Sequence, residues 1–150
     1  MTISDVMTTD VKCVRATTTA ADARALMRRH NFHHLVVTNG DNLVGIVSAR
    51  DLGRRRASPA AKQTVEDAMN RHVLTIDRTA TLGRAAFTMR GRGVGCLVVL
   101  ERGKVAGLVT AADLLGLIDR SVQRGKRADV GSAIHHRVPH RHQARSSGKW

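Results

Sequence analysis

The stretch Gly45-Ile46-Val47-Ser48-Ala49-Arg50-Asp51 returns 62 residues later as Gly107-Leu108-Val109-Thr110-Ala111-Ala112-Asp113. Outward from it, residues 4–52 align with residues 66–114 without a gap, and 16 of the 49 aligned positions are identical. An internal repeat of this kind determines the architecture, because each copy buries its apolar face against its neighbour. We therefore expect two similar units packed about a pseudo-twofold axis, with ligand sites in the crevices between them.

Each copy predicts the order strand, helix, strand, strand, helix, which gives a mixed α/β fold built from two β-α-β-β-α repeats. Thr19 stands three residues before Asp22, a capping-box spacing that starts a helix. Residues 39–42 (Asn-Gly-Asp-Asn) separate two β-branched runs and are typical of a hairpin turn. The expected strands are residues 11–14, 35–38, 43–47, 73–76, 97–100 and 105–109, and the expected helices are residues 19–30, 49–56, 82–92 and 111–122.

The repeats leave a basic C-terminal end. We assign residues 3–57 to the first repeat, 58–64 to a linker, 65–122 to the second repeat and 123–150 to a tail. From residue 125 onward the tail has no apolar period, which predicts disorder. The chain has 25 Lys and Arg against 12 Asp and Glu, a net charge of +13, so it attracts polyanions.

Composition argues against several classes of protein. Aromatic residues make up 2 % of the chain, too few for the stacking platforms that bind single-stranded nucleic acid. No apolar run approaches the roughly 18–20 residues of a membrane span. The N-terminus is polar and unlike a signal peptide. The two cysteines form no CxxC pair, which favours free thiols and a cytoplasmic location.

The repeated seven-residue motif supports two interpretations. In the structural one, Ser48 and Thr110 are N-caps of helices, and Asp51 and Asp113 complete capping boxes. In the functional one, the hydroxyls at the helix starts bind an anion such as phosphate. The carboxylates then accept hydrogen bonds from a vicinal diol such as ribose.

Other features also occur in both copies: an Asp-x-Met lead at residues 5–7 and 67–69, a Leu-Val-Val strand, and the Gly-x-x-Ser/Thr-x-x-Asp exit. With the order of elements over residues 3–120, they make the chain resemble tandem CBS (cystathionine β-synthase-type) domains. The resemblance implies a homodimeric module that binds an adenosine-containing ligand such as AMP, ADP, ATP, S-adenosylmethionine or NAD. It assigns phosphate and ribose to the hydroxyls and carboxylates of the motif.

The residues before the Leu-Val-Val strand differ between the copies. The first copy has His33-His34, where the resemblance to the γ subunit of AMP-activated kinase implies contacts to phosphate. The second has Gly95-Cys96, so we expect unequal clefts, with phosphorylated adenosine held more tightly at Asp51. If the histidines are cations, affinity should weaken from pH 6 to 8. The alternative is that they are partly buried structural residues.

The preferred function is a non-enzymatic regulatory module that senses an adenine nucleotide, acts on an unknown protein and has no covalent cofactor. No nucleophile is paired with a base, and the His-rich run 135–142 lacks the carboxylates or thiols that would complete a metal site. The alternative function is binding of nucleic acid or another polyanion by the basic tail, with the repeats as a dimerisation scaffold. A steep salt dependence of binding would identify this alternative.

Overall fold

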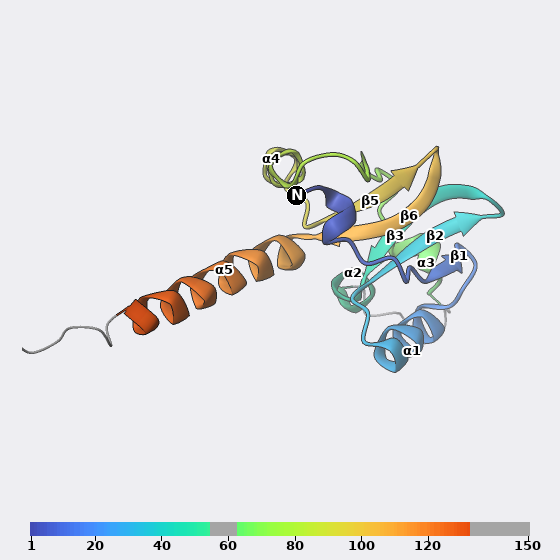
Figure 1. Ribbon diagram of the computed structural model, residues 1–150. Coiled ribbons are helices and arrows are strands. Elements are labelled where there is room, and N and C mark those ends of the chain that lie inside the picture. Colours follow the sequence, from blue (N-terminus) through green and yellow to red (C-terminus); the bar gives the residue numbers. More distant parts are fainter. Residues whose placement is uncertain (55–62, 133–150) are drawn as a thin grey trace, which may run out of the picture. The chain divides into compact units, whose positions relative to one another are not determined.

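The computed structural model describes residues 1–54 and 63–132, and its elements follow the predicted order in both repeats (Figure 1). The chain divides into two units, residues 1–116 and 117–150, and both sheets belong to the first. The first repeat contains β1 (Cys13–Arg15), α1 (Ala20–His30), β2 (His34–Asn39), β3 (Asn42–Ser48) and α2 (Ala49–Arg54). The second contains β4 (Thr75–Asp77), α4 (Leu82–Arg92), β5 (Cys96–Glu101), β6 (Lys104–Thr110) and α5 (Ala111–Ser132).

Each repeat forms a three-stranded sheet, in the orders β1-β2-β3 and β4-β5-β6. The first and second strands are parallel because a helix connects them, and the second and third form an antiparallel hairpin. The register is the same in both sheets. Val36 lies between Cys13 and Ile46, and its repeat equivalent Val98 lies between the matching residues of the second sheet.

The helices α1 and α4 begin and end where the sequence predicts. The Thr19 hydroxyl accepts a hydrogen bond from the amide of Asp22 (3.1 Å), and α1 ends at Asn31 in the left-handed conformation (φ 56°). Thr81 caps α4 in the same way, and α4 ends at Gly93 (φ 65°). Each cap satisfies an amide that has no partner within the helix.

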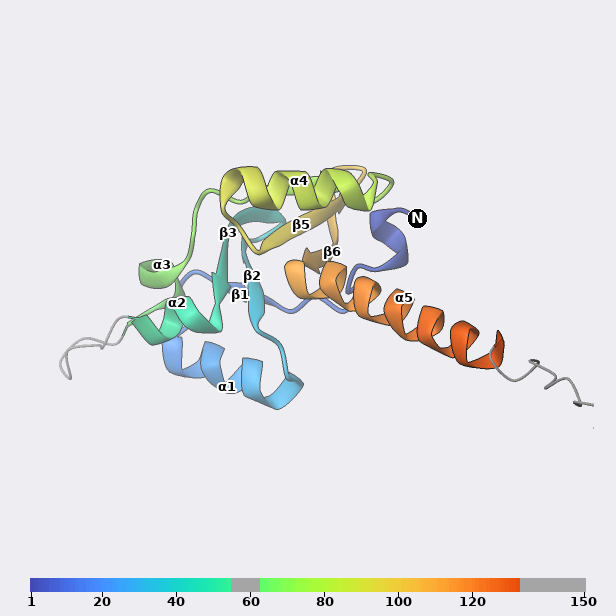
Figure 2. The same cartoon turned by 90° about the vertical axis from the view of Figure 1, so that its left-hand side faces the viewer.

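Three clusters of apolar side chains form the interior. In the first repeat, Ala23 and Met27 of α1 pack against the sheet, and their equivalents on α4 do the same in the second. In the third cluster Val36 of β2 contacts Val98 of β5 and Leu108 of β6, which joins the two repeats. Figure 2 shows α1 and α2 beside the first sheet and α4 beside the second.

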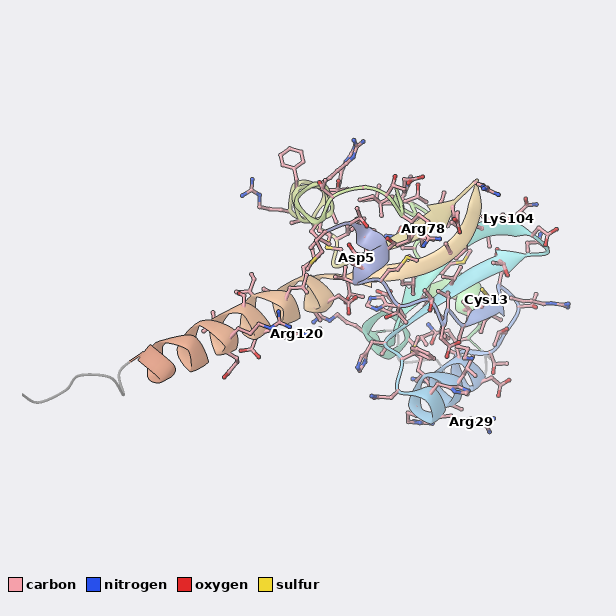
Figure 3. All side chains as sticks on the ribbon, in the orientation of Figure 1. Asp5, Cys13, Arg29, Arg78, Lys104 and Arg120 are labelled. Atoms are coloured by element: carbon pink, nitrogen blue, oxygen red, sulfur yellow. The ribbon has the colours of Figure 1, made fainter. Side chains whose placement is uncertain are left out.

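Among the described residues no polar or charged residue is fully buried. Basic side chains such as Arg29 and Lys104 lie at the surface, as does the Cys13 thiol (Figure 3). These positive charges therefore stay in contact with solvent, where the free-energy cost of holding a charge is lowest.

The N-terminal end of the first repeat packs on the second repeat. The amide of Ile3 donates to the carbonyl of Ala80 (2.9 Å), and Thr8 and Leu108 exchange two backbone hydrogen bonds (2.8 and 2.9 Å). The Ile3 side chain is completely buried in the second core. Residues 2–9, which we call the first leading segment, include the 3-10 helix η1 (Ile3–Asp5), which the sequence analysis missed.

The second leading segment, residues 63–71, packs on the first repeat in the same way. Asn70 and Ile46 exchange two backbone hydrogen bonds (2.8 and 3.0 Å). Val65, the repeat equivalent of Ile3, is fully buried in the first core and begins the short helix α3 (Val65–Ala68), also missed from sequence. Each core thus takes residues from the leading segment of the other half of the chain.

The last helix is longer than predicted. α5 extends to Ser132, beyond its predicted end at residue 122 and into the stretch that we assigned to the tail. The Lys, Arg and Ala residues of this stretch are good helix formers, which favours continuation of the helix in spite of its glycines and charge. Residues 133–150, including the His-rich run, lie outside the described residues. None of the described helices is both long and apolar enough to cross a membrane.

Candidate functional site: the cleft at Asp51

A cavity of about 170 Å³ lies between the repeats at the start of α2, and we call it the Asp51 cleft. Its walls come from β2, β3 and α2 of the first repeat and from residues 70–74 and 94–96 of the second. The lining residues are His34, Ile46, Ser48, Asp51, Asn70, His72, Val73, Leu74, Val94, Gly95 and Cys96. The structure therefore brings five sequence-predicted site residues to one cavity: His34, Ser48, Asp51, Gly95 and Cys96.

Ser48 and Asp51 bond to each other across the first turn of α2. The amide of Ser48 donates to Oδ2 of Asp51 (2.9 Å), and the amide of Asp51 donates to Oγ of Ser48 (3.1 Å). This reciprocal pair is the predicted capping box. Among the described residues, Oδ1 of Asp51 has no hydrogen-bond donor, so one carboxylate oxygen is left to accept from a ligand.

Thr110 and Asp113 form the same pair at the start of α5. The amide and the hydroxyl of Thr110 both donate to Oδ2 of Asp113 (2.8 Å each), and the amide of Asp113 lies 3.3 Å from the Thr110 hydroxyl oxygen. Neither residue lines the Asp51 cleft. The second copy of the motif therefore lies outside this lining, although the charge of Asp113 acts on His34 and Cys96 within it.

The two predicted histidines lie in different surroundings. His34 is half-buried in the cleft, and burial lowers its pKa from the ordinary value of 6.5, although the carboxylates of Asp51 and Asp113 oppose this. The His33 side chain is exposed and does not line the cavity, while its carbonyl accepts from the amide of Ala49 (2.9 Å). In the ligand-free chain, His34 is therefore mostly neutral at pH 7.

Gly95 and Cys96 occupy the equivalent positions in the second repeat. The Gly95 carbonyl accepts from the amide of Ala111 (2.9 Å), which matches the bond made by His33. Burial, together with the charge of Asp113, raises the pKa of the Cys96 thiol to about 12. Cys96 thus lines the cavity as a neutral, unreactive group.

His72 also lines the cleft, within the stretch near residues 70–76 that we expected from the sequence to close it, although no role was assigned to its side chain. Its exposed imidazole comes from the stretch that links the second leading segment to β4. No sequence motif marks this stretch. The equivalent residue of the first repeat is Asp10, and this change from acid to imidazole was the available signal.

Two larger cavities lie away from the motif. One of about 800 Å³ is formed by the second repeat alone, and one of about 630 Å³ lies beside Arg15 and Arg71. The convergence of motif residues favours the Asp51 cleft as the main site despite its smaller volume. Within residues 1–54 and 63–132, no group of three or more His, Cys, Asp or Glu side chains is arranged to hold a metal ion.

Comparison with known proteins gives matches over both repeats. The family model for the CBS domain matches residues 3–57 and 65–120. A CBS domain-containing protein of Dictyostelium discoideum is 31 % identical over 130 residues, which cover 77 % of this chain and 90 % of that protein. Homoserine O-acetyltransferase of Methanocorpusculum labreanum is 32 % identical over 116 residues and 76 % of this chain. The match spans only 23 % of that enzyme.

Solved structures agree with the fold. An uncharacterized conserved protein from Pyrococcus horikoshii has a TM-score of 0.70 at 30 % identity, over 77 % of this chain and 90 % of that one. A CBS-domain pair crystallised with 5′-methylthioadenosine and S-adenosyl-L-methionine has a TM-score of 0.73 at 23 % identity, over 81 % and 98 % of the two chains.

Proposed function

The chain belongs to the CBS-domain family, and on that premise we propose that it is a non-catalytic regulatory module that binds an adenosine-containing ligand in the Asp51 cleft. The observation that carries the proposal is the convergence of Ser48, Asp51 and half-buried His34 on one cavity walled by both repeats. The crystallised CBS-domain pair, which holds two adenosine compounds, supports this class of ligand.

The lining chemistry fits a nucleoside. The free Oδ1 of Asp51 can accept hydrogen bonds from a ribose diol, and the side chains of Ile46, Val73 and Leu74 supply apolar walls for a base. A volume of about 170 Å³ is below the roughly 300 Å³ at which small-molecule sites begin. Binding must therefore displace side chains at the open side of the cleft, where Asn70 and His72 are exposed.

The ligand could regulate another protein because it would bind between the two repeats. A ligand that binds only the assembled repeats stabilises their contact by mass action. In particular, it would hold residues 70–74 against β3, beside the backbone bonds between Asn70 and Ile46. A regulated protein that recognises the ordered pair would then respond to the concentration of the ligand.

Replacing Asp51 by alanine should weaken ligand binding by about 1–3 kcal/mol, because the substitution removes charged hydrogen bonds to the ribose. The measurement is calorimetric titration of the full chain with AMP, ATP, 5′-methylthioadenosine and S-adenosylmethionine. Asp113→Ala is the matched comparison, since it removes the equivalent cap from α5 and a charge that acts on His34 but no lining residue of the Asp51 cleft. Equal losses in both variants, or no binding of any adenosine compound to the wild-type chain, would overturn the proposal.

The pH below which binding stops strengthening should be lower than the sequence suggested, because burial lowers the pKa of His34. Because His34 is mostly neutral when the cleft is empty, a phosphate that bonds to its protonated form must recruit a proton. Affinity for AMP should then weaken as the pH rises from 6 to 8, by up to about tenfold per pH unit, and should level off only below the lowered pKa of His34. The stability of the ligand-free chain should change in the opposite sense, since the unfolded state binds the proton more tightly.

Calorimetry in two buffers of different ionisation enthalpy measures the proton uptake directly. His34→Gln should abolish both the uptake and the rise in affinity, whereas His72→Gln should preserve them. If proton uptake survives in His34→Gln and disappears in His72→Gln, His72 and not His34 takes up the proton, and this expectation is contradicted.

We also propose that two chains associate through the helices of the second repeat. The side chains of Phe87 on α4 and Leu115 on α5 are 70 % and 64 % exposed, and their repeat equivalents are Ala25 and Gly53. Light scattering of the full chain should give a dimer, and Leu115→Asp should shift it to a monomer with its ellipticity unchanged. A wild-type monomer at micromolar concentration would contradict this.

A further inference from the structure

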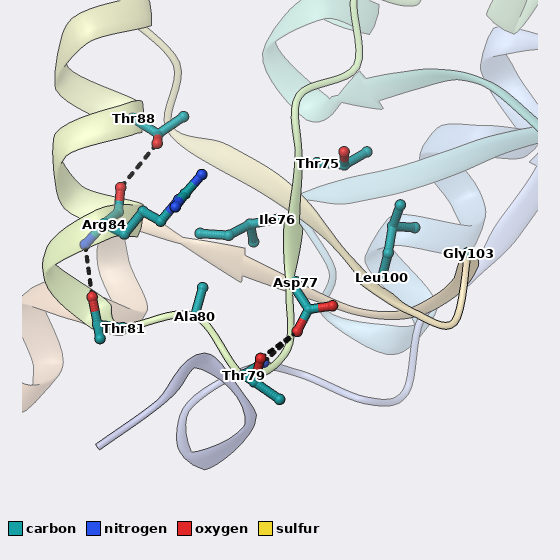
Figure 4. A pocket seen from close by; sticks show the side chains of 10 residues that line it. All are labelled: Thr75, Ile76, Asp77, Thr79, Ala80, Thr81, Arg84, Thr88, Leu100 and Gly103. Atoms are coloured by element: carbon teal, nitrogen blue, oxygen red, sulfur yellow. Dashed lines mark hydrogen bonds between the residues drawn. The ribbon is translucent and has the colours of Figure 1, made fainter.

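The cavity of about 800 Å³ lies within the second repeat, apart from the cleft between the repeats. It is bounded by β4, the loop that follows it, α4, and the β5–β6 hairpin at Leu100 and Gly103 (Figure 4). Its volume falls in the range of roughly 300–1,000 Å³ that is usual for small-molecule sites. Ile76, Ala80 and Leu100 give it apolar surface.

Asp77 supplies a fixed negative charge to this cavity. Its Oδ1 accepts hydrogen bonds from the hydroxyl of Thr79 (2.6 Å) and from the amide of Thr79 (2.8 Å). These bonds lower the pKa of Asp77, so the carboxylate stays ionised. Oδ2 has no hydrogen-bond donor among the residues that the structure describes, which leaves it to accept from a ligand.

Arg84 supplies the positive charge. Its side chain extends from α4 above Ile76, while the Asp77 carboxylate lies on the far side of Ile76 (Figure 4). Within the described ranges the Arg84 guanidinium makes neither an ion pair nor a hydrogen bond, and it is more than 4.0 Å from any carboxylate oxygen there. The cavity therefore holds two opposite charges that do not neutralise each other.

Two threonine hydroxyls in the lining can accept further hydrogen bonds. The Thr79 hydroxyl donates its proton to Asp77, and the Thr88 hydroxyl donates its proton to the carbonyl of Arg84 (2.9 Å). Both oxygens keep lone pairs but have no proton left to give. They suit a ligand group that carries several donors, and an ammonium group carries three.

The first repeat does not offer this arrangement. The equivalents of Asp77 and Arg84 are Arg15 and Asp22, so the charges are exchanged, and the equivalent of Thr88 is Leu26. The combination of a carboxylate, threonine hydroxyls and a guanidinium is therefore specific to the second repeat.

We propose that this cavity binds a small zwitterion, a free amino acid or a close analogue, with its ammonium group at Asp77 and its carboxylate at Arg84. A guanidinium binds a carboxylate through two parallel hydrogen bonds. The Asp77 carboxylate and the hydroxyl oxygen of Thr79 accept from the ammonium group, and the side chain of the amino acid lies against Ile76 and Leu100. The site is independent of the adenosine ligand proposed for the Asp51 cleft, and each chain has one.

The test is a nuclear magnetic resonance titration of the full, isotope-labelled chain with each standard amino acid, with β-alanine and with γ-aminobutyrate, at millimolar concentrations. The expected result is saturable shifts of the backbone amides of Thr75, Asp77, Thr79, Arg84 and Thr88 with one or a few of these compounds. Arg84→Gln should weaken this binding by about tenfold or more, because it removes the charged donor. Arg90→Gln, on the same helix but outside the cavity, should change it less than about twofold.

Inorganic phosphate, AMP and putrescine serve as competing probes. If phosphate or AMP binds in a way that depends on Arg84 but survives in Asp77→Asn, the cavity is a site for simple anions. That result would overturn the proposal. Binding of putrescine that survives in Arg84→Gln would indicate a diamine site and overturn it equally. Absence of any shift with the amino acids, or shifts confined to Ser48, Asp51 and the rest of the Asp51 cleft, would also overturn it.

Discussion

Replacing Ile3 by alanine is expected to lower the free energy of unfolding by about 2–5 kcal/mol, the usual cost of truncating a fully buried isoleucine. The Ile3 side chain is 0 % exposed and packs in the cluster that contains Ile76, Met89 and Val99. The loss should therefore appear in the second repeat, although residue 3 lies at the start of the first. Chemical denaturation gives the magnitude, and amide hydrogen exchange gives the location.

Val65→Ala is the matched control, because Val65 is the repeat equivalent of Ile3 and is buried in the other core. It should accelerate exchange mainly in β2 and β3, whereas Ile3→Ala should accelerate exchange mainly in β5 and β6. The expectation fails if Ile3→Ala loosens the first repeat, or if the two variants cannot be distinguished by location. Either result would mean that the leading segments pack on their own repeats in solution.

Secondary structure was predicted well wherever local signals specify it. The bounds of α4 match the prediction because Thr81 caps its start and Gly93 ends it in a left-handed conformation. The first strands of the two repeats begin two residues later than predicted, at Cys13 and Thr75. Val11 and Val73, which suggested the earlier start, instead contact the cluster between the sheets. Their apolar character reflects packing between the repeats and not strand pairing.

The exchange of leading segments could not be predicted from the sequence. Helices of three and four residues are too short to show a period, and the two cores present equivalent residues to Ile3 and Val65. Either segment has the composition to pack on either repeat. Which repeat each leading segment packs on depends on how the chain is connected in the tertiary fold, and local sequence does not specify it.

The candidate site was predicted in part. The motif places Ser48 and Asp51 together because their spacing forms a capping box, whatever the rest of the fold does. The charge of His34 was not predictable, since burial sets it and burial depends on packing between the repeats. The side chain of His72 reaches the cleft through the same packing of one half of the chain on the other.

Gly107→Ala is expected to destabilise the chain by about 3 kcal/mol, at the upper end of the usual cost of overpacking. A methyl group at this position would stand 2.7 Å from the backbone carbonyl oxygen of Thr8 and 3.0 Å from the sulfur of Met7. Thr8 cannot withdraw without losing both of its backbone hydrogen bonds to Leu108. The substitution should thus detach the first leading segment, and chemical denaturation measures the loss.

Gly45, the equivalent of Gly107 in the first repeat, makes a looser contact of the same kind and allows the two costs to be compared. At Gly45 the methyl group would meet the flexible side chain of Met69 at 2.6 Å, but the nearest backbone atom, the carbonyl oxygen of Asn70, is 3.2 Å away. Gly45→Ala should therefore cost less than Gly107→Ala, because a side chain can move where a backbone cannot. Gly91→Ala, in the exposed last turn of α4 where the methyl group would meet nothing within 4 Å, should stabilise the chain by at most about 1 kcal/mol. An equal cost at Gly45 and Gly107 would show that contact with the methionines, and not with the backbone, requires glycine in this motif.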